Sequence, residues 1–121
     1  MIRKIICAAV FLLAALFTKA QPFADEIAAF KKQDSIAFPP KHAILFVGSS
    51  SFRLWKDVQD YFPGYAIINR GFGGSSFPDV IRYADQIILP YHPKQIVIYC
   101  ENDFANNDSL QPADVTGRFI E

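Results

Sequence analysis

Cysteine and histidine are scarce in this sequence, which contains two of each in 121 residues. Cys7 lies in an apolar N-terminal segment, so Cys100 is the single cysteine of residues 21–121. One cysteine cannot form an internal disulfide, and the stability of the domain must therefore come from its hydrophobic core. The sequence excludes the class of small domains that depend on disulfide bonds.

Clusters of basic residues are also missing. Arg3, Lys4 and Lys19 are the charged residues of residues 1–20, which leaves residues 21–121 with 9 basic and 12 acidic residues, a net charge of −3. A mildly acidic chain without a basic patch is not expected to bind nucleic acid or an anionic membrane surface.

Long hydrophobic runs are limited to one, the thirteen residues from Ile5 to Phe17. This run is shorter than the ~20 residues that span a bilayer, and it follows a positively charged start and precedes the small residues Thr18 and Ala20. These features predict a signal peptide over residues 1–20 and a mature chain of residues 21–121 that is secreted or periplasmic, with no stable membrane span. An uncleaved membrane anchor is the alternative.

The remaining chain alternates short apolar runs with amphipathic segments. The expected strands are residues 43–47, 65–68 and 95–99. Two helices are expected over residues 22–33 and 52–61, and a third begins at the capping box 76–79 and ends at Pro90. A polar loop over residues 102–111 precedes a fourth helix, which begins at Pro112. The stripe of the third helix is Val80, Ile81, Ala84, Ile87 and Ile88. This alternation predicts an α/β protein, a three-layer α/β/α sandwich with a parallel sheet of flavodoxin-like character.

Small, polar and glycine-rich residues follow each expected strand, at 48–51, 69–74 and 100–103. The carboxyl ends of parallel strands meet at one edge of a sheet, where α/β proteins place their functional groups. We therefore expect a site built from these three segments.

Each segment has a functional interpretation and a structural one. A serine among residues 49–51 can be a nucleophile raised at the sheet edge or a helix cap. The glycines of 71–74 can bring a backbone amide to an oxyanion or form a plain turn, and their spacing does not match the dinucleotide fingerprint. Asn102 can donate from its side-chain amide or form an Asx turn.

Neither histidine is placed to act as a catalytic base. His42 precedes the first expected strand and His92 precedes the third, so both lie at the amino ends of strands, about 17–20 Å from the opposite edge. A general base must be within hydrogen-bonding reach of its proton. We interpret both as surface histidines.

At these segments the sequence resembles the SGNH, or GDSL-like, hydrolases. Residues 44–55 (ILFVGSSSFRLW) resemble the first block of that family, with Gly48-Ser49-Ser50 where the family has Gly-Asp-Ser. Residues 69–74 (NRGFGG) resemble the second block and residues 100–103 (CEND) the third, in the family's order. The resemblance covers residues 43–121, so residues 21–121 are interpreted as the N-terminal part of an SGNH hydrolase domain.

The resemblance implies a serine esterase with Ser50 as nucleophile and with the Gly74 amide and the Asn102 side chain as oxyanion donors. It implies no metal and no cofactor, and an ester substrate that is a small molecule or carbohydrate, with acetyl groups on a carbohydrate as one case. The oligomeric state is not predicted.

Two departures from the family pattern carry expectations of their own. The third block usually has a glycine shortly before the asparagine, and Tyr99-Cys100-Glu101 has none, which predicts a displaced Asn102 or a strained turn. The family's fourth block, Asp-x-x-His, is absent from the 121 residues, so the chain reads as truncated and we expect it to have little or no esterase activity by itself. The alternatives are a non-catalytic module that binds phosphate or carbohydrate and a non-functional gene remnant.

Overall fold

The computed structural model describes residues 21–105 and 109–120. The signal peptide expected over residues 1–20 lies outside this range. The helices are α2 (Ala24–Ile36), α3 (Ser50–Leu54), α4 (Phe77–Ile87), α5 (Asn102–Ala105) and α6 (Pro112–Ile120), with 3₁₀ helices η2 (Val58–Tyr61) and η3 (Leu89–Tyr91); the strands are β1 (Ile44–Gly48), β2 (Ile67–Gly71) and β3 (Gln95–Tyr99). Neither described part contains a helix long and apolar enough to cross a bilayer.

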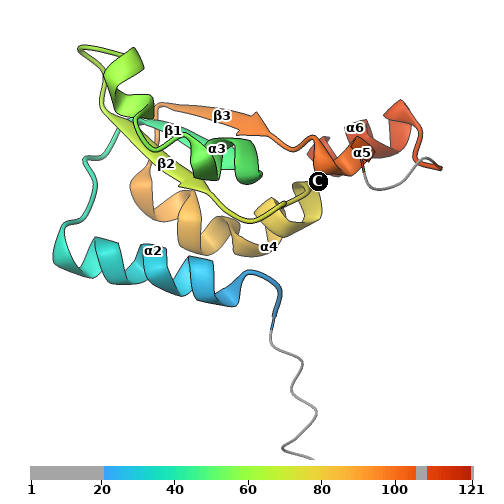
Figure 1. The fold of residues 1–121 in the computed structure, drawn as a ribbon, viewed down its shortest axis with the longest axis horizontal. Coiled ribbons are helices and arrows are strands. Elements are labelled where there is room, and N and C mark those ends of the chain that lie inside the picture. Colours follow the sequence, from blue (N-terminus) through green and yellow to red (C-terminus); the bar gives the residue numbers. More distant parts are fainter. Residues whose placement is uncertain (1–20, 106–108, 121) are drawn as a thin grey trace, which may run out of the picture.

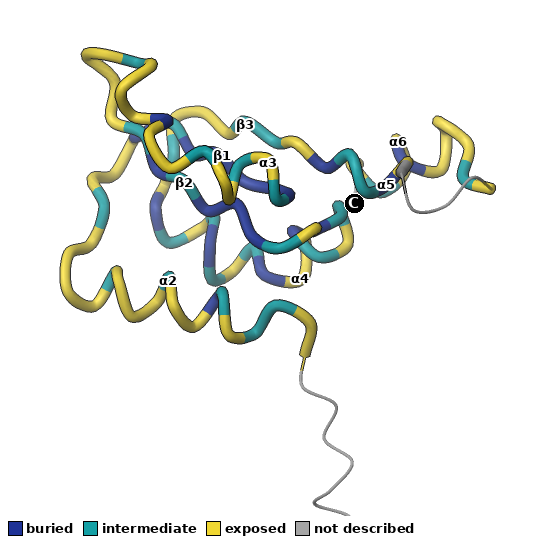
Figure 2. Tube along the Cα trace, in the orientation of Figure 1, coloured by how far each residue is buried: buried dark blue, intermediate teal, exposed yellow. Residues whose placement is uncertain are grey.

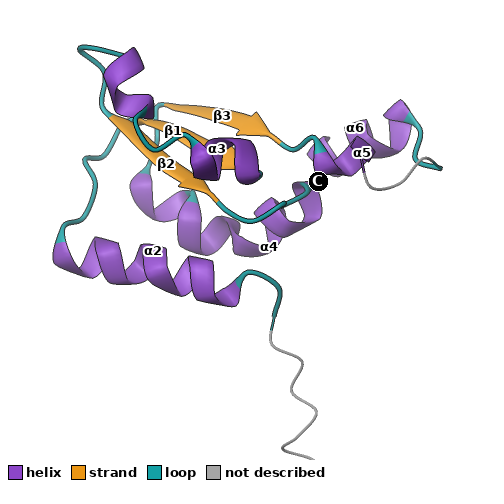
Figure 3. Ribbon diagram, viewed as in Figure 1, coloured by secondary structure: helices purple, strands orange, loops and turns teal. Residues whose placement is uncertain are grey.

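The three strands form a parallel sheet in the order β2-β1-β3 (Figure 3). Ile44 of the central strand is opposite Ile67 on one side and Gln95 on the other, and this register continues to the strand ends. All three strands therefore end at the same edge of the sheet. The predicted α/β class and parallel sheet are confirmed.

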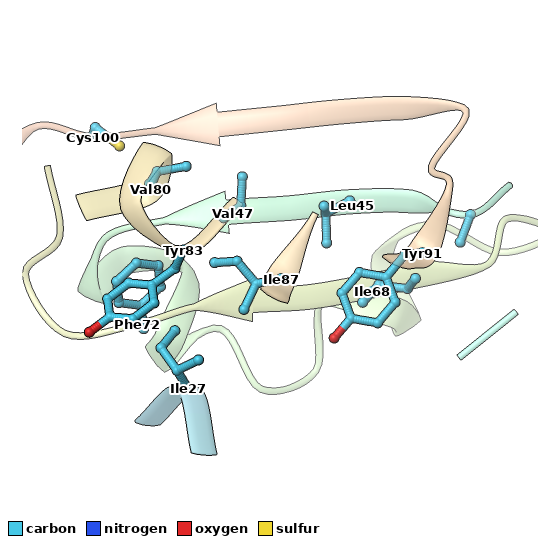
Figure 4. Close-up of a cluster of buried hydrophobic side chains, with 11 residues drawn as sticks. Ile27, Leu45, Val47, Ile68, Phe72, Val80, Tyr83, Ile87, Tyr91 and Cys100 are labelled. Atoms are coloured by element: carbon cyan, nitrogen blue, oxygen red, sulfur yellow. The ribbon is translucent and has the colours of Figure 1, made fainter. Parts of the chain in front are cut away.

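Helices cover both faces of the sheet, which gives the predicted three-layer α/β/α arrangement (Figure 1). Leu45 and Val47 of β1 are fully buried in the cluster formed with α4 and α2 (Figure 4). Phe46 points to the opposite face, where its ring contacts Phe52 and Trp55 at centroid distances of 5.1 and 6.0 Å. Alternate residues of a strand face opposite sides, so an apolar β1 is what a sheet covered on both faces requires.

A buried polar network attaches α2 to the sheet. Arg70 of β2 is 7% exposed, and its Nη2 lies 2.6 Å from Asp34 Oδ1 while its Nε donates to the Tyr91 hydroxyl at 2.8 Å. The Tyr91 hydroxyl in turn donates to Asp34 Oδ2 at 2.5 Å. Burial is the main cause that raises the pKa of Tyr91 to about 12, so this hydroxyl keeps its proton. Each polar group of the network has a partner, as buried polar groups require.

The helix predicted over residues 52–61 is wrong as a single element, since the structure has α3, a break and then η2. The side chain of Asn69 on β2 explains the break. Its Nδ2 donates to the carbonyls of Phe52 and Trp55 at 2.7 and 3.1 Å, in place of the backbone donors four residues later that a continuing helix would supply.

Two further boundaries and one buried position differ from the sequence predictions. The second strand is shifted to Ile67–Gly71, so Asn69 and Arg70 belong to the strand rather than to the turn after it. The polar loop expected over 102–111 begins with the short helix α5. Ile81 is 42% exposed, and Tyr83 takes the place in the buried stripe of α4 that was predicted for it.

The other elements are confirmed, with small shifts at their ends. β3 has the predicted bounds, and α2 and α6 lie where helices were expected. At the start of α4, Asp79 Oδ2 accepts hydrogen bonds from the backbone N–H and the hydroxyl of Ser76, at 3.0 and 2.8 Å. Figure 2 shows that burial is concentrated in β1, β2 and the inner side of α4, while the outer side of α2 and most of α6 are exposed.

The two edges of the sheet differ. On the outer side of β2, Gln59 Oε1 accepts from the Ile67 N–H at 2.9 Å and Asn69 Oδ1 accepts from the Gly71 N–H at 2.9 Å. On the outer side of β3, no strand of the described chain is paired, and Ile96 and Tyr99 are 43% and 47% exposed.

Candidate active site

The serine turn joins β1 to α3 at the carboxyl edge of the sheet. Gly48 ends the strand with φ +134°, and a Cβ at this position would lie 2.1 Å from the Tyr99 carbonyl oxygen, so only glycine fits. Ser49 follows, fully buried, with its N–H donating to the same carbonyl at 2.9 Å. Ser50 then begins α3 and is partly exposed.

The three serines do not act as a simple helix cap. Ser49 occupies the N-cap position, but its hydroxyl makes no cap hydrogen bond and donates instead to Glu101 Oε2. The Ser51 hydroxyl donates to Glu101 Oε1 at 3.1 Å. Glu101 therefore holds the residues on both sides of Ser50, and within the described chain the Ser50 hydroxyl is left without a hydrogen-bonded side chain.

Gly74 and Asn102 are brought together from the other two segments. A Cβ at Gly74 would lie 3.3 Å from Asn102 Nδ2 and 3.7 Å from its Cγ, so a side chain here would crowd the asparagine amide. Gly74 follows β2 and Asn102 begins α5 after β3, and the same edge of the sheet carries Ser50. The structure thus places all three predicted site residues at one edge, with two of them in contact distance of each other.

Asp103 fixes the position of the third segment. It is 1% exposed, and its Oδ2 accepts from the Phe77 N–H at the start of α4 at 2.8 Å. Its Oδ1 accepts from Arg118 of α6 at 2.8 Å. Asp103 therefore joins α5 to α4 and α6, and this fixes the position of the neighbouring Asn102.

The missing glycine of the third segment does not strain the turn. None of Tyr99, Cys100 and Glu101 has a positive φ. The close approach between the first and third strands is instead made possible by Gly48. The sequence-based expectation of a strained turn is therefore wrong, and Asn102 still lies beside Gly74.

Two titratable groups beside the serine turn have shifted pKa values. Burial works to raise the pKa of Glu101, but hydrogen bonds from Ser49, its own backbone and Ser51 outweigh it, so the pKa is lowered and the carboxylate stays charged. Burial raises the pKa of Cys100 to about 12, with further contributions from the charges of Asp103, Glu101 and Asp79.

Both histidines lie at the opposite edge of the sheet, as predicted. His42 and His92 are exposed and precede β1 and β3, and the His42 N–H donates to the His92 carbonyl at 3.1 Å. Neither can reach Ser50. A groove of about 380 Å³ between α2, α3 and β2 is lined by Glu26, Arg53 and Asn69 among others, and it does not include Ser50, Gly74 or Asn102.

This fold has a solved counterpart. A structure provisionally described as a platelet activating factor from Streptococcus pneumonia matches with a TM-score of 0.61 at 19% sequence identity. The match covers 93% of this chain and 51% of that chain, so the present chain spans about half the length of its counterpart. At this identity the likeness shows the α/β/α fold. No protein-family model and no curated protein matches the sequence.

Sequence reasoning missed the roles of Glu101 and Asp103 in this site. Both lie in the third segment that was singled out, but an acidic residue after a strand gives no indication of its partner. The signal that could have found Glu101 is the row of three serines at 49–51, which supplies more hydroxyls than one helix cap uses.

Proposed function

We propose that this chain supplies the nucleophile and oxyanion-binding groups of a secreted serine esterase of the SGNH type. Ser50 is the nucleophile, and the Gly74 amide, the Asn102 side chain and the Ser50 amide bind the oxyanion. The substrate is a carboxylic ester of a small molecule or carbohydrate, such as an acetyl ester.

The observation that carries the proposal is the pairing of Gly74 with Asn102 at the edge where Ser50 begins α3. A backbone amide and a side-chain amide that lie close together can both donate to an oxyanion, and removing one such donor typically costs about 3 kcal/mol of transition-state stabilisation. The Glu101 carboxylate on the serine turn makes a phosphate-binding module less favourable, because it places a negative charge where a phosphate would bind.

The chemistry is an acyl transfer in two steps. The Ser50 oxygen forms a bond to the ester carbonyl carbon as its proton passes to a base, and the bond from that carbon to the alcohol oxygen then breaks as the alcohol takes the proton. Water releases the acid from Ser50 by the same route. The base in the resembling family is the histidine of an Asp-x-x-His motif, which the 121 residues do not contain.

Replacing Ser50 tests the nucleophile. In the natural protein, Ser50→Ala is expected to abolish both the hydrolysis of an activated acetyl ester and covalent labelling by a serine-reactive phosphonate, a loss of at least about 10³-fold. Ser35→Ala is the matched control, since Ser35 is an exposed serine of α2 whose hydroxyl bonds only to the Lys32 carbonyl. The control should keep full activity and labelling.

Two results would contradict the proposal. Labelling that persists in folded Ser50→Ala would place the nucleophile elsewhere. A natural protein that neither hydrolyses the ester nor reacts with the phosphonate, but binds a sugar or phosphate equally well with and without Ser50, would be a binding module.

A further inference from the structure

We infer that Glu101 makes the site selective against anionic esters, so that its substrates are neutral or positively charged close to the scissile bond. This inference rests on the proposed esterase function. It assigns a specificity-determining role to a residue for which the family pattern implies none.

The position of Glu101 follows from its two hydrogen bonds. Ser49 and Ser51 are the neighbours of Ser50 along the chain, and both donate their hydroxyls to this one carboxylate. The negative charge is thereby held against the nucleophile's own turn, and Glu101 is only partly buried.

The charge of Glu101 is not neutralised by a cation of the described chain. The nearby carboxylates of Asp103 and Asp79 have arginine partners, Arg118 at 2.8 Å and Arg82 at 3.4 Å. Glu101 has hydroxyl partners instead, which hold the charge in place without cancelling it. Burial is the main cause of the raised pKa of the adjacent Cys100, and the negative charges of Asp103, Glu101 and Asp79 raise it further.

A fixed charge at this position acts on substrate charge through Coulomb's law. A carboxylate or phosphate on the acyl group or the alcohol, placed within several ångströms of Ser50, is repelled, and the repulsion weakens as salt shortens the screening length. A neutral ester does not experience this term. The ratio of kcat/KM for a neutral and an anionic ester therefore isolates the charge of Glu101 from its other contributions.

The experiment measures that ratio with nitrophenyl acetate and nitrophenyl hemisuccinate, using the natural protein. Glu101→Gln is expected to shift the ratio toward the anionic ester by about fivefold, and raising the salt from about 0.01 M to about 1 M should shift the wild-type ratio in the same direction. Asp85→Asn removes an acid from the exposed side of α4 and should leave the ratio unchanged.

The outcomes separate this inference from the proposed function. A Glu101→Gln protein that loses activity equally toward both esters, with no salt effect on the wild-type ratio, overturns the inference and leaves the esterase intact. If Glu101→Gln does not fold, two other measurements test the inference. The first is the salt series on the wild type, and the second is the ratio for Glu101→Asp, which keeps the charge and should keep the ratio. Failure of the proposed function shows itself differently, as a lack of Ser50-dependent hydrolysis of either ester.

Discussion

Cys100 lies between the end of β3 and Glu101, with 7% of its surface exposed. Thiol chemistry needs the thiolate, and burial together with three surrounding carboxylates opposes its formation. The residue is thus a small apolar part of the hydrophobic core, and its position next to the candidate site gives it no chemistry of its own.

The native thiol should be nearly inert. At about pH 8, we expect iodoacetamide to alkylate Cys100 more than about 100-fold more slowly in the folded protein than in urea, because a pKa near 12 leaves very little thiolate. The measurement is the rate of mass increase of residues 21–121, in which Cys100 is the single cysteine. Equal rates in the two conditions would show that the residue is accessible and ordinary in acidity.

At the scale of elements, the feature that sets the position of α2 is its attachment to β2 through Asp34 and Arg70. The Arg70 guanidinium lies between two rings, 5.0 Å from that of Phe30 and 5.1 Å from that of Tyr91. The Arg70 side chain therefore holds α2, β2 and η3 together. An isolated helix of this length would be marginal in water, so the stability of α2 depends on such contacts.

Removing the acid of this network should be costly. Asp34→Ala leaves Arg70 buried without its carboxylate, and we expect the free energy of unfolding to fall by about 3–5 kcal/mol. Asp25→Ala, at an exposed position of the same helix, is expected to change it by less than about 0.5 kcal/mol. Urea unfolding of both variants measures the difference, and similar costs at the two positions would show that Arg70 relaxes to water.

Local patterns predicted most of the elements, because apolar runs and a capping box are encoded by adjacent residues. They could not predict the break after α3 or the buried environment of Arg70, since both depend on a side chain from a distant part of the chain. In the site, the roles of Ser50, Gly74 and Asn102 could be proposed from motifs. Their position at one edge of the sheet could be predicted from the parallel topology. The hydrogen bonds from Ser49 and Ser51 to Glu101 could not be predicted, because these serines are 52 and 50 residues away from Glu101 in the sequence.

For the molecule as a whole, the difference between the two sheet edges matters most. Side chains of Gln59 and Asn69 occupy the outer backbone groups of β2, which prevents another strand from pairing there. β3 has no such protection within the described chain, and it exposes Ile96 and Tyr99 along its length. Strand addition is therefore directed to one side.

Residues 21–121 produced alone should associate through β3 as the concentration rises. Ile96→Lys is expected to reduce this association, since a charge on an edge strand opposes pairing. Ile81→Lys is the matched control, because Ile81 is equally exposed (42% against 43%) but lies on α4. Light scattering across a concentration series compares them, and an equal effect of both substitutions would point to general surface hydrophobicity instead.

The Asp34–Arg70–Tyr91 network also has a consequence for biosynthesis. Its members all precede β3 in the sequence, so they leave the ribosome before any residue of β3 does. Domains can begin to fold from their N-terminal side during translation, so α2, β1, β2 and α4 can close around their shared core first. Export of an unfolded chain, which the proposed secretion would need, must therefore begin before this network closes.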